Sequence, residues 1–133
     1  MKALKARMTR SLPLEARVIA CDNSGAKVLK ILAVHGHKTV RGRYPAAGVG
    51  DLVMTTVKKG KLEMRKQVFP AIIVRQKKEY RRLDGTRIKF EDNAAVVLKD
   101  EKGNPKGTLL KGPIAKEVAD RWPAVAKIAS MIV

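Results

Sequence analysis

The sequence predicts a mainly β protein built around a small barrel, with a short helical region at its C-terminal end. Two observations predict the barrel: short runs rich in β-branched residues recur along the chain, and clusters of turn-forming residues separate them. A third observation places the helical region, because apolar residues recur at a spacing of four at Ile114, Val118 and Trp122. The 133 residues have the length of one compact domain.

The expected elements follow one another in a simple order. Residues 1–14 form a basic N-terminal arm, residues 15–111 the barrel and residues 112–133 the helical tail. The expected barrel strands cover residues 16–21, 27–34, 51–57, 71–77 and 94–99. Between them, residues 35–50 form a long exposed loop or splayed hairpin, and residues 58–61 form a charged turn.

Two further local patterns are specific. The runs 80–83 and 86–90 are separated by Asp84-Gly85, which predicts a two-residue hairpin turn because both positions of that turn adopt positive φ. Near the C-terminus, Gly112-Pro113 places proline at the first position of a helix, which Pro123 then ends. Residues 125–132 are expected to add a further helical turn or two.

The charge balance indicates a polyanionic partner. Lys and Arg total 29 and Asp and Glu total 12, so the formal net charge is +17, yet 45% hydrophobic residues are enough to build a core. Such a surplus in a small fold causes self-repulsion that a polyanion would relieve. Nucleic acid is the leading candidate, and an anionic membrane surface is the alternative.

Several classes of protein are excluded by the same inspection. No apolar run approaches the roughly 20 residues that span a bilayer, and the N-terminus lacks the apolar stretch of a signal peptide. The single cysteine, Cys21, excludes an intrachain disulfide framework and fits a reducing compartment. We therefore expect a cytoplasmic protein with no membrane partner.

Positive charge is concentrated in residues 58–89, whereas the C-terminal tail is nearly balanced. This asymmetry predicts one basic barrel flank that contacts RNA phosphates and displaces their counterions. Because alternate residues of a strand share a face, Arg75 should project with Lys77, and Arg87 with Lys89. The candidate RNA-binding residues of the flank are Lys58, Lys59, Lys61, Arg65, Lys66, Arg75, Lys77, Lys78, Arg81, Arg82, Arg87 and Lys89. The exposed loop adds Lys38, Arg41, Arg43 and Tyr44.

Few aromatic residues are available to stack on bases. Phe69 and Phe90 lie in apolar contexts and are expected in the core, and Tyr80 is expected to pack its ring beneath an arginine. Tyr44, in the exposed loop, is the best stacking candidate. Binding should therefore be dominated by phosphate and ribose contacts to folded, largely helical RNA.

No catalytic constellation emerges. The phosphate-cradling P-loop and the dinucleotide-binding glycine fingerprint are both missing from the sequence. His35 and His37 have no neighbouring carboxylate or cysteine that would complete a metal site. We expect no metal and no cofactor; a basic enzyme that uses His35 or His37 is the weakest alternative.

Several ordered motifs resemble the universal large-subunit ribosomal protein fourteen family, over about residues 16–133. The basic N-terminus and the loop of residues 42–47 are similar to the archaeal and eukaryotic branch. The motifs are Asp22-Asn23-Ser24-Gly25-Ala26, Ala47-Gly48-Val49-Gly50-Asp51, residues 71–78, residues 84–98, Gly107-Thr108 and Gly112-Pro113-Ile114.

The resemblance implies a non-enzymatic protein with a five-stranded β-barrel, a β-ribbon and a C-terminal helical portion. It also implies binding to large-subunit rRNA and to neighbouring ribosomal proteins, and contact with small-subunit rRNA at an intersubunit bridge. The C-terminal region would lie where subunit anti-association factors dock, so we expect Val118, Trp122 and Lys127 to make protein contacts. The competing hypothesis is a free-standing barrel-type RNA-binding module, such as an RNA chaperone or translation factor.

Overall fold

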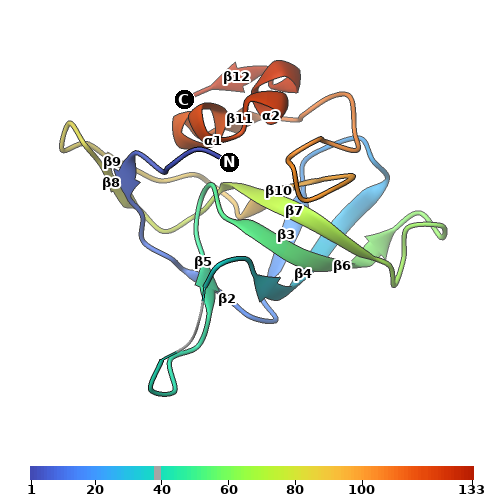
Figure 1. Cartoon of the computed structure of the whole chain (residues 1–133). Helices are drawn as coiled ribbons and strands as arrows, with labels where there is room; N and C mark the ends of the chain where they lie inside the picture. The colour runs from blue at the N-terminus through green and yellow to red at the C-terminus, as the bar shows by residue number, and fades with distance from the viewer. Residues whose placement is uncertain (38–39) are drawn as a thin grey trace.

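Five strands close into a barrel in the order β10-β3-β4-β6-β7 (Figure 1). The computed structural model describes residues 1–37 and 40–133. All neighbouring barrel strands are antiparallel except β10 and β3, which run parallel. The barrel strands are β3 (Arg17–Ala20), β4 (Ala26–Val34), β6 (Leu52–Gly60), β7 (Val68–Arg75) and β10 (Ala94–Val97). The predicted fold class, mainly β with a five-stranded barrel, is confirmed.

Three small sheets and two helices complete the described part of the chain. The N-terminal arm supplies two of their strands, so it is folded against the rest of the molecule. The first sheet, which we call the ribbon, has the order β1-β8-β9 and comprises β1 (Ala6–Arg7), β8 (Tyr80–Arg82) and β9 (Arg87–Ile88). The second pairs β2 (Leu12–Pro13) with β5 (Ala46–Ala47), and the third pairs β11 (Pro113–Ile114) with β12 (Met131–Ile132). The helices are α1 (Lys116–Arg121) and α2 (Pro123–Ile128).

The turns differ from expectation in two places. Strand β6 continues through Gly60, so the expected charged turn at residues 58–61 lies mostly within the strand. The turn between β8 and β9 comprises residues 83–85, because the amide of Arg82 donates to the carbonyl of Thr86 and the amide of Gly85 donates to the carbonyl of Arg82. Only Gly85 there has positive φ, at 89°, which is typical of a three-residue hairpin with one left-handed position.

The C-terminal helix begins later than the sequence predicts. Pro113 lies in strand β11, which pairs in parallel with β12, and α1 starts at Lys116. Residues 131–132 are likewise strand rather than helix. Tertiary hydrogen bonds account for this, since the amide of Val133 donates to Ile114 and the amide of Lys116 donates to Val133. Pro123 ends α1 as expected and also occupies the first turn of α2.

Two apolar cores lie on opposite faces of the barrel wall. One fills the barrel with residues such as Leu29, Ile31 and Val97, and the other joins the outer face of β7 and β10 to the two helices. Strand β10 is therefore buried along its whole length, as are residues 71–75 of β7. Phe69 and Phe90 pack, partly buried, against these cores, as the sequence predicts.

Candidate nucleic-acid interface

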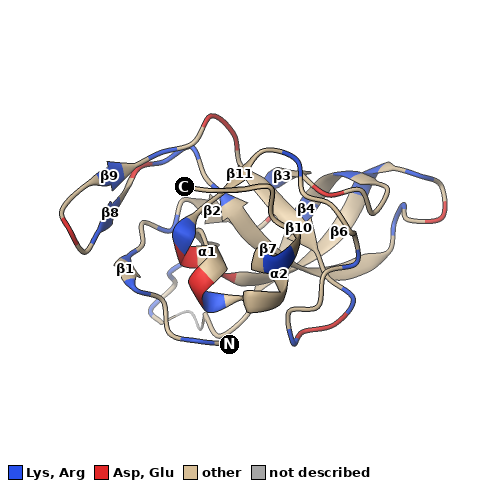
Figure 2. Ribbon diagram, turned by 90° about the horizontal axis from the view of Figure 1, so that it is seen from above, with Lys and Arg blue, Asp and Glu red and all other residues tan. Residues whose placement is uncertain are grey.

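The basic residues expected on one flank lie at two opposite ends of the molecule. They form two groups, one at each end of β7. This strand has eight residues with a rise of about 3.3 Å each, so it holds the two groups roughly 26 Å apart. The first group, the turn end, lies where β6 joins β7, and the second, the ribbon end, lies at and beside β8 and β9 (Figure 2). The prediction of a single flank is wrong, because a rigid strand separates residues that are near one another in sequence. The turn end is Lys58, Lys59, Lys61, Arg65 and Lys66; the ribbon end is Lys77, Lys78, Arg81, Arg87 and Lys89.

All ten of these side chains are exposed to solvent. Lys78 lies 3.3 Å from Glu79 in a surface ion pair, and the other nine form no ion pair within residues 1–37 and 40–133. Surface pairs of this kind contribute little, typically below about 1 kcal/mol. Both ends therefore present cations that are free to contact phosphates.

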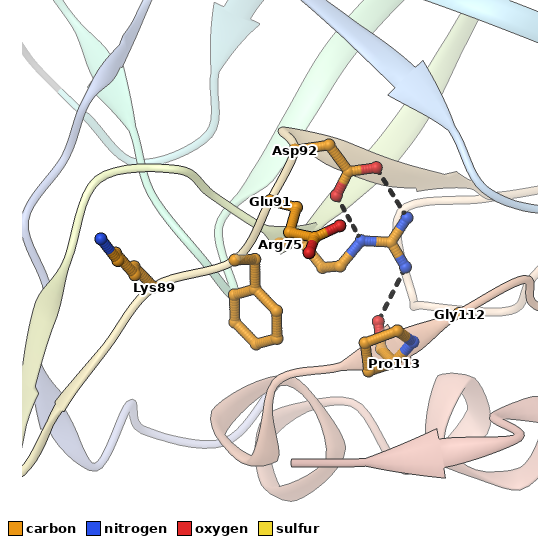
Figure 3. Close-up of a pocket in the computed structure, with 7 residues that line it drawn as sticks. Arg75, Lys89, Glu91, Asp92, Gly112 and Pro113 are labelled. Carbon is orange, nitrogen blue, oxygen red and sulfur yellow. Dashed lines mark hydrogen bonds and ion pairs between the residues drawn. The ribbon is translucent and has the colours of Figure 1, made fainter.

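Two arginines from the predicted set are structural instead. Arg75 is only 7% exposed. Its Nε and Nη2 donate to the two oxygens of Asp92, at 2.7 and 3.1 Å, and its Nη1 donates to the carbonyl of Pro113 (Figure 3). The same Nη1 also donates to the carbonyl of Lys111. These bonds fasten the segment that leads into β11 to the barrel wall. The expectation that Arg75 projects with Lys77 towards RNA is wrong, because β7 ends at Arg75 and its guanidinium is already enclosed.

Arg82 is the second of these. Its Nε donates to Oε1 of Glu117 at 2.7 Å, and its Nη2 donates to the carbonyl of Val133. The hydroxyl of Tyr80 donates to Oε2 of the same carboxylate at 2.8 Å. Burial, and then this hydrogen bond, raise the pKa of Tyr80. The Cζ atom of Arg82 lies over the Tyr80 ring, 6.0 Å from its centroid, so the expected packing of Tyr80 beneath an arginine is present. Together these groups attach the ribbon to α1.

The loop between β4 and β5 presents further exposed groups. Arg41, Arg43 and Tyr44 are exposed, with Tyr44 at 75%, while Lys38 lies outside the described residues. His37 closes the base of this loop, because its Nδ1 accepts the amide of Ala46 at 3.1 Å. Tyr44 is thus available for stacking, as its sequence context predicts.

The tail is arranged differently from the expectation. Val118 is fully buried and Trp122 is 2% exposed, so neither can contact a partner at the surface. The indole Nε1 of Trp122 donates to the carbonyl of Gly50 at 2.9 Å, which anchors the helices on the barrel. Lys127 is exposed, and so are Met131 and Ile132. The expected protein contact through Val118 and Trp122 is therefore wrong, since the four-residue stripe that identifies them faces the core.

Sequence reasoning also missed basic residues that the fold brings to the two ends. Lys27 and Lys111 line a hollow of about 510 Å³ together with Lys59 and Lys61. Arg7, from the arm, lies beside the ribbon end because β1 pairs with β8. Nothing in the local sequence marks these residues, because each reaches its place through pairing with a distant segment.

The motifs that carried the resemblance have structural roles in this geometry. Asn23 accepts a hydrogen bond from the amide of Thr108 at 2.8 Å, and Asp22 accepts one from the amide of Val97 at 3.1 Å. This turn therefore secures the end of β10 and the segment that follows it. Asp51 accepts the amide of Gly48 at 2.8 Å, and buried Gln76 accepts the amide of Val49 at 3.0 Å. The motifs build the barrel ends on which the basic groups stand.

A sequence model of the family described as ribosomal protein L14p/L23e matches residues 11–133. The chain belongs to this family. Among curated proteins, those named large ribosomal subunit protein uL14 are similar over nearly the full length of both chains. The chain is 57% identical to the one from Methanococcus maripaludis strain S2 over 132 residues, 99% of each chain. It is 56% identical to the one from Nanoarchaeum equitans over 133 residues, 100% of each chain.

Membership of the L14p/L23e family makes this a non-enzymatic ribosomal protein, as expected. It also confirms the expected location, the ribosome within the cytoplasm. Within the described parts of the chain, no cluster of three or more histidine, cysteine or acidic side chains could hold a metal ion. Over the same residues no helix has the length and apolar character needed to cross a bilayer.

Proposed function

We propose that this protein is a structural constituent of the large ribosomal subunit that binds large-subunit rRNA through two separate basic ends. Family membership supports the ribosomal role. The observation that carries the rRNA contact is the position of the ten exposed basic side chains at the two ends of a rigid barrel wall. Contacts of this kind neutralise phosphates without reading sequence, so the two ends would orient folded RNA on the barrel.

The tail would serve protein and intersubunit contacts. Its exposed side chains include Lys127, Met131 and Ile132, and apolar groups exposed at about half of their area or more suit a protein neighbour. We propose that this surface faces neighbouring ribosomal proteins and the site where a subunit anti-association factor docks. The contact with small-subunit rRNA at an intersubunit bridge belongs to the same proposal.

Sedimentation of tagged protein from an archaeal lysate tests the ribosomal role. A structural constituent should co-sediment with large subunits at one copy each and stay bound through a moderate salt wash. A free-standing RNA chaperone or translation factor should instead spread over many RNAs and leave ribosomes during the wash. Recovery mainly in the unbound fractions would contradict the proposal.

Binding to purified large-subunit rRNA tests the turn end. The variant K59Q/K61Q removes two exposed cations. The negative slope of log K against log salt concentration should therefore become shallower by about 1.4–1.8. The matched control K2Q/K102Q removes two exposed cations beside the helices, outside both ends, and should leave the slope unchanged. Equal slopes for the two variants would remove the turn end from the interface.

A further inference from the structure

The register of the ribbon places three arginines in one row. In β1 and β8, Arg7 lies directly opposite Arg81, and in β8 and β9, Arg81 lies directly opposite Arg87. Residues that face one another across neighbouring strands project from the same face of a sheet. Strands about 4.8 Å apart therefore set a row roughly 10 Å long from Arg7 to Arg87. All three side chains are exposed.

The two faces of the ribbon have opposite chemistry. Tyr80 and Arg82 alternate with Arg81, so they project from the other face, where both bind the carboxylate of Glu117. On the face of the row, none of the three arginines forms an ion pair within the part of the chain that the structure describes. Of the nearby carboxylates, Glu79 pairs with Lys78 at 3.3 Å and also interacts with the charge of Arg87, and Asp84 accepts from the amide and hydroxyl of Thr86. One partly shared carboxylate beside three arginines leaves the row with a net positive charge.

A row of like charges directly opposite one another destabilises a sheet. The ribbon has few backbone hydrogen bonds to offset this repulsion, because β1 and β9 have only two residues each. An anion that lies along the row would relieve the remaining repulsion among the three arginines. The geometry thus points to a ligand that supplies several negative charges in a line.

From this we propose that Arg7, Arg81 and Arg87 form a docking row for the phosphodiester backbone of an RNA strand. Each guanidinium presents a planar fork of donors that matches two oxygens of one phosphate. The row also adjoins Lys77, Lys78 and Lys89 of the ribbon end, so a strand bound along it would remain in a positive field. An acidic protein segment is less suited, because Lys, which surrounds the row, is depleted in protein interfaces. The inference rests on the proposed rRNA binding and names the group that performs it.

The row gives the N-terminal arm a function. Arg7 reaches the row only because β1 pairs with β8, so RNA bound along the row holds β1 in place. The main-chain amides of residues 6–7 should then exchange with solvent more slowly in the RNA complex than in the free protein.

The decisive experiment measures binding of the full chain to purified Methanococcus maripaludis large-subunit rRNA over a series of KCl concentrations. In R7Q/R81Q/R87Q, three phosphate contacts are lost. The negative slope of log K against log salt concentration should become shallower by about 2–3, and binding at 0.1 M KCl should weaken at least tenfold. The variant R7K/R81K/R87K keeps the charge but loses the forks, so it should recover the slope and only part of the affinity. The control K2Q/K99Q/K102Q removes three exposed cations away from the ribbon and should bind like wild type.

Unfolding in urea separates a binding role from a structural one. Because the row is repulsive in the free protein, R7Q/R81Q/R87Q should unfold at the same or a higher urea concentration than wild type. A lower midpoint, or a salt slope equal to that of the control, would overturn the inference. So would a row variant that loses binding to poly-glutamate but keeps wild-type binding to rRNA. If wild type binds rRNA but the row variant behaves like the control, only the inference about the row fails. If wild type itself binds no rRNA, the proposed function fails as well.

Discussion

The bond network around Glu117 should be a principal attachment of the helices, and E117Q tests it. The carboxylate is 5% exposed and accepts from the hydroxyl of Tyr80 at 2.8 Å and from Arg82 Nε at 2.7 Å and Nη2 at 3.3 Å. Gln keeps one acceptor oxygen but removes the charge and turns an amide group towards these donors. The substitution thus leaves the Arg82 guanidinium uncompensated while its side chain is only 17% exposed.

The magnitude follows from this burial. Removing one partner of a buried ion pair costs about 3–5 kcal/mol, and the partial exposure of Arg82 lowers the expectation to about 2–4 kcal/mol. With a urea m value of about 2 kcal/mol/M, the unfolding midpoint should fall by about 1–2 M. Trp122 is the single tryptophan and lies in the core beneath the helices, so its fluorescence reports this transition directly.

Two comparisons make the measurement decisive. D120N removes an exposed carboxylate from the same helix and should change the free energy of unfolding by less than about 0.5 kcal/mol. In R82Q/E117Q the loss should be smaller than the sum of the two single losses, because neither charge is then left alone. If E117Q unfolds within 0.5 kcal/mol of wild type, apolar contacts alone hold the helices and the argument from the ion pair is refuted.

Three other predictions concern stability and reactivity. In G103A the new Cβ would lie 2.6 Å from Cε3 of Trp122, at a φ of 103°, so the free energy of unfolding measured in urea should fall by about 2–4 kcal/mol. The control G36A also has positive φ but no atom within 4 Å of the new Cβ, so it should lose only about 1 kcal/mol. Equal losses for the two variants would contradict the packing argument. Burial raises the pKa of the Asp22 carboxyl, although hydrogen bonds from its neighbours lower it. The folded protein then binds this proton more readily than the unfolded chain, so its contribution to stability is full at low pH and is lost as pH rises through the folded pKa. The free energy of unfolding of wild type minus that of D22N should therefore be larger at pH 4 than at pH 7, and a constant difference would show that burial does not control this group. Burial also raises the pKa of the Cys21 thiol to about 12, so a disulfide reagent at pH 8 should label the protein only after denaturation; rapid labelling of the native protein would disprove this.

Local chemistry accounts for the parts of the fold that the sequence predicts. Runs such as residues 27–34 and 71–77 are rich in β-branched residues and bounded by turn formers, and these preferences act within a few residues. The strands therefore appear within a few residues of their expected positions. The net charge and the family motifs are also properties of the chain itself, so they indicate a ribosomal, RNA-binding protein before any coordinates are known.

The destination of each charged side chain is decided by distant partners instead. Arg75 and Arg82 look like their exposed neighbours in sequence, but Asp92 and Glu117 lie 17 and 35 residues further along the chain. Pro113 starts a strand rather than a helix because β12 returns to pair with it. Such pairings depend on which segments meet when the chain closes into a barrel, and local preferences carry no record of that.

The chain alone therefore determined the class of fold, the excess of positive charge and the family. The tertiary structure decided how that charge is divided, because β7 separates the turn end from the ribbon end and strand pairing brings Arg7 opposite Arg81. The physical reason is the distance along the chain over which each interaction acts. Backbone preferences are set by neighbours in sequence, whereas the electrostatic field at the surface of the folded protein is set by neighbours in space.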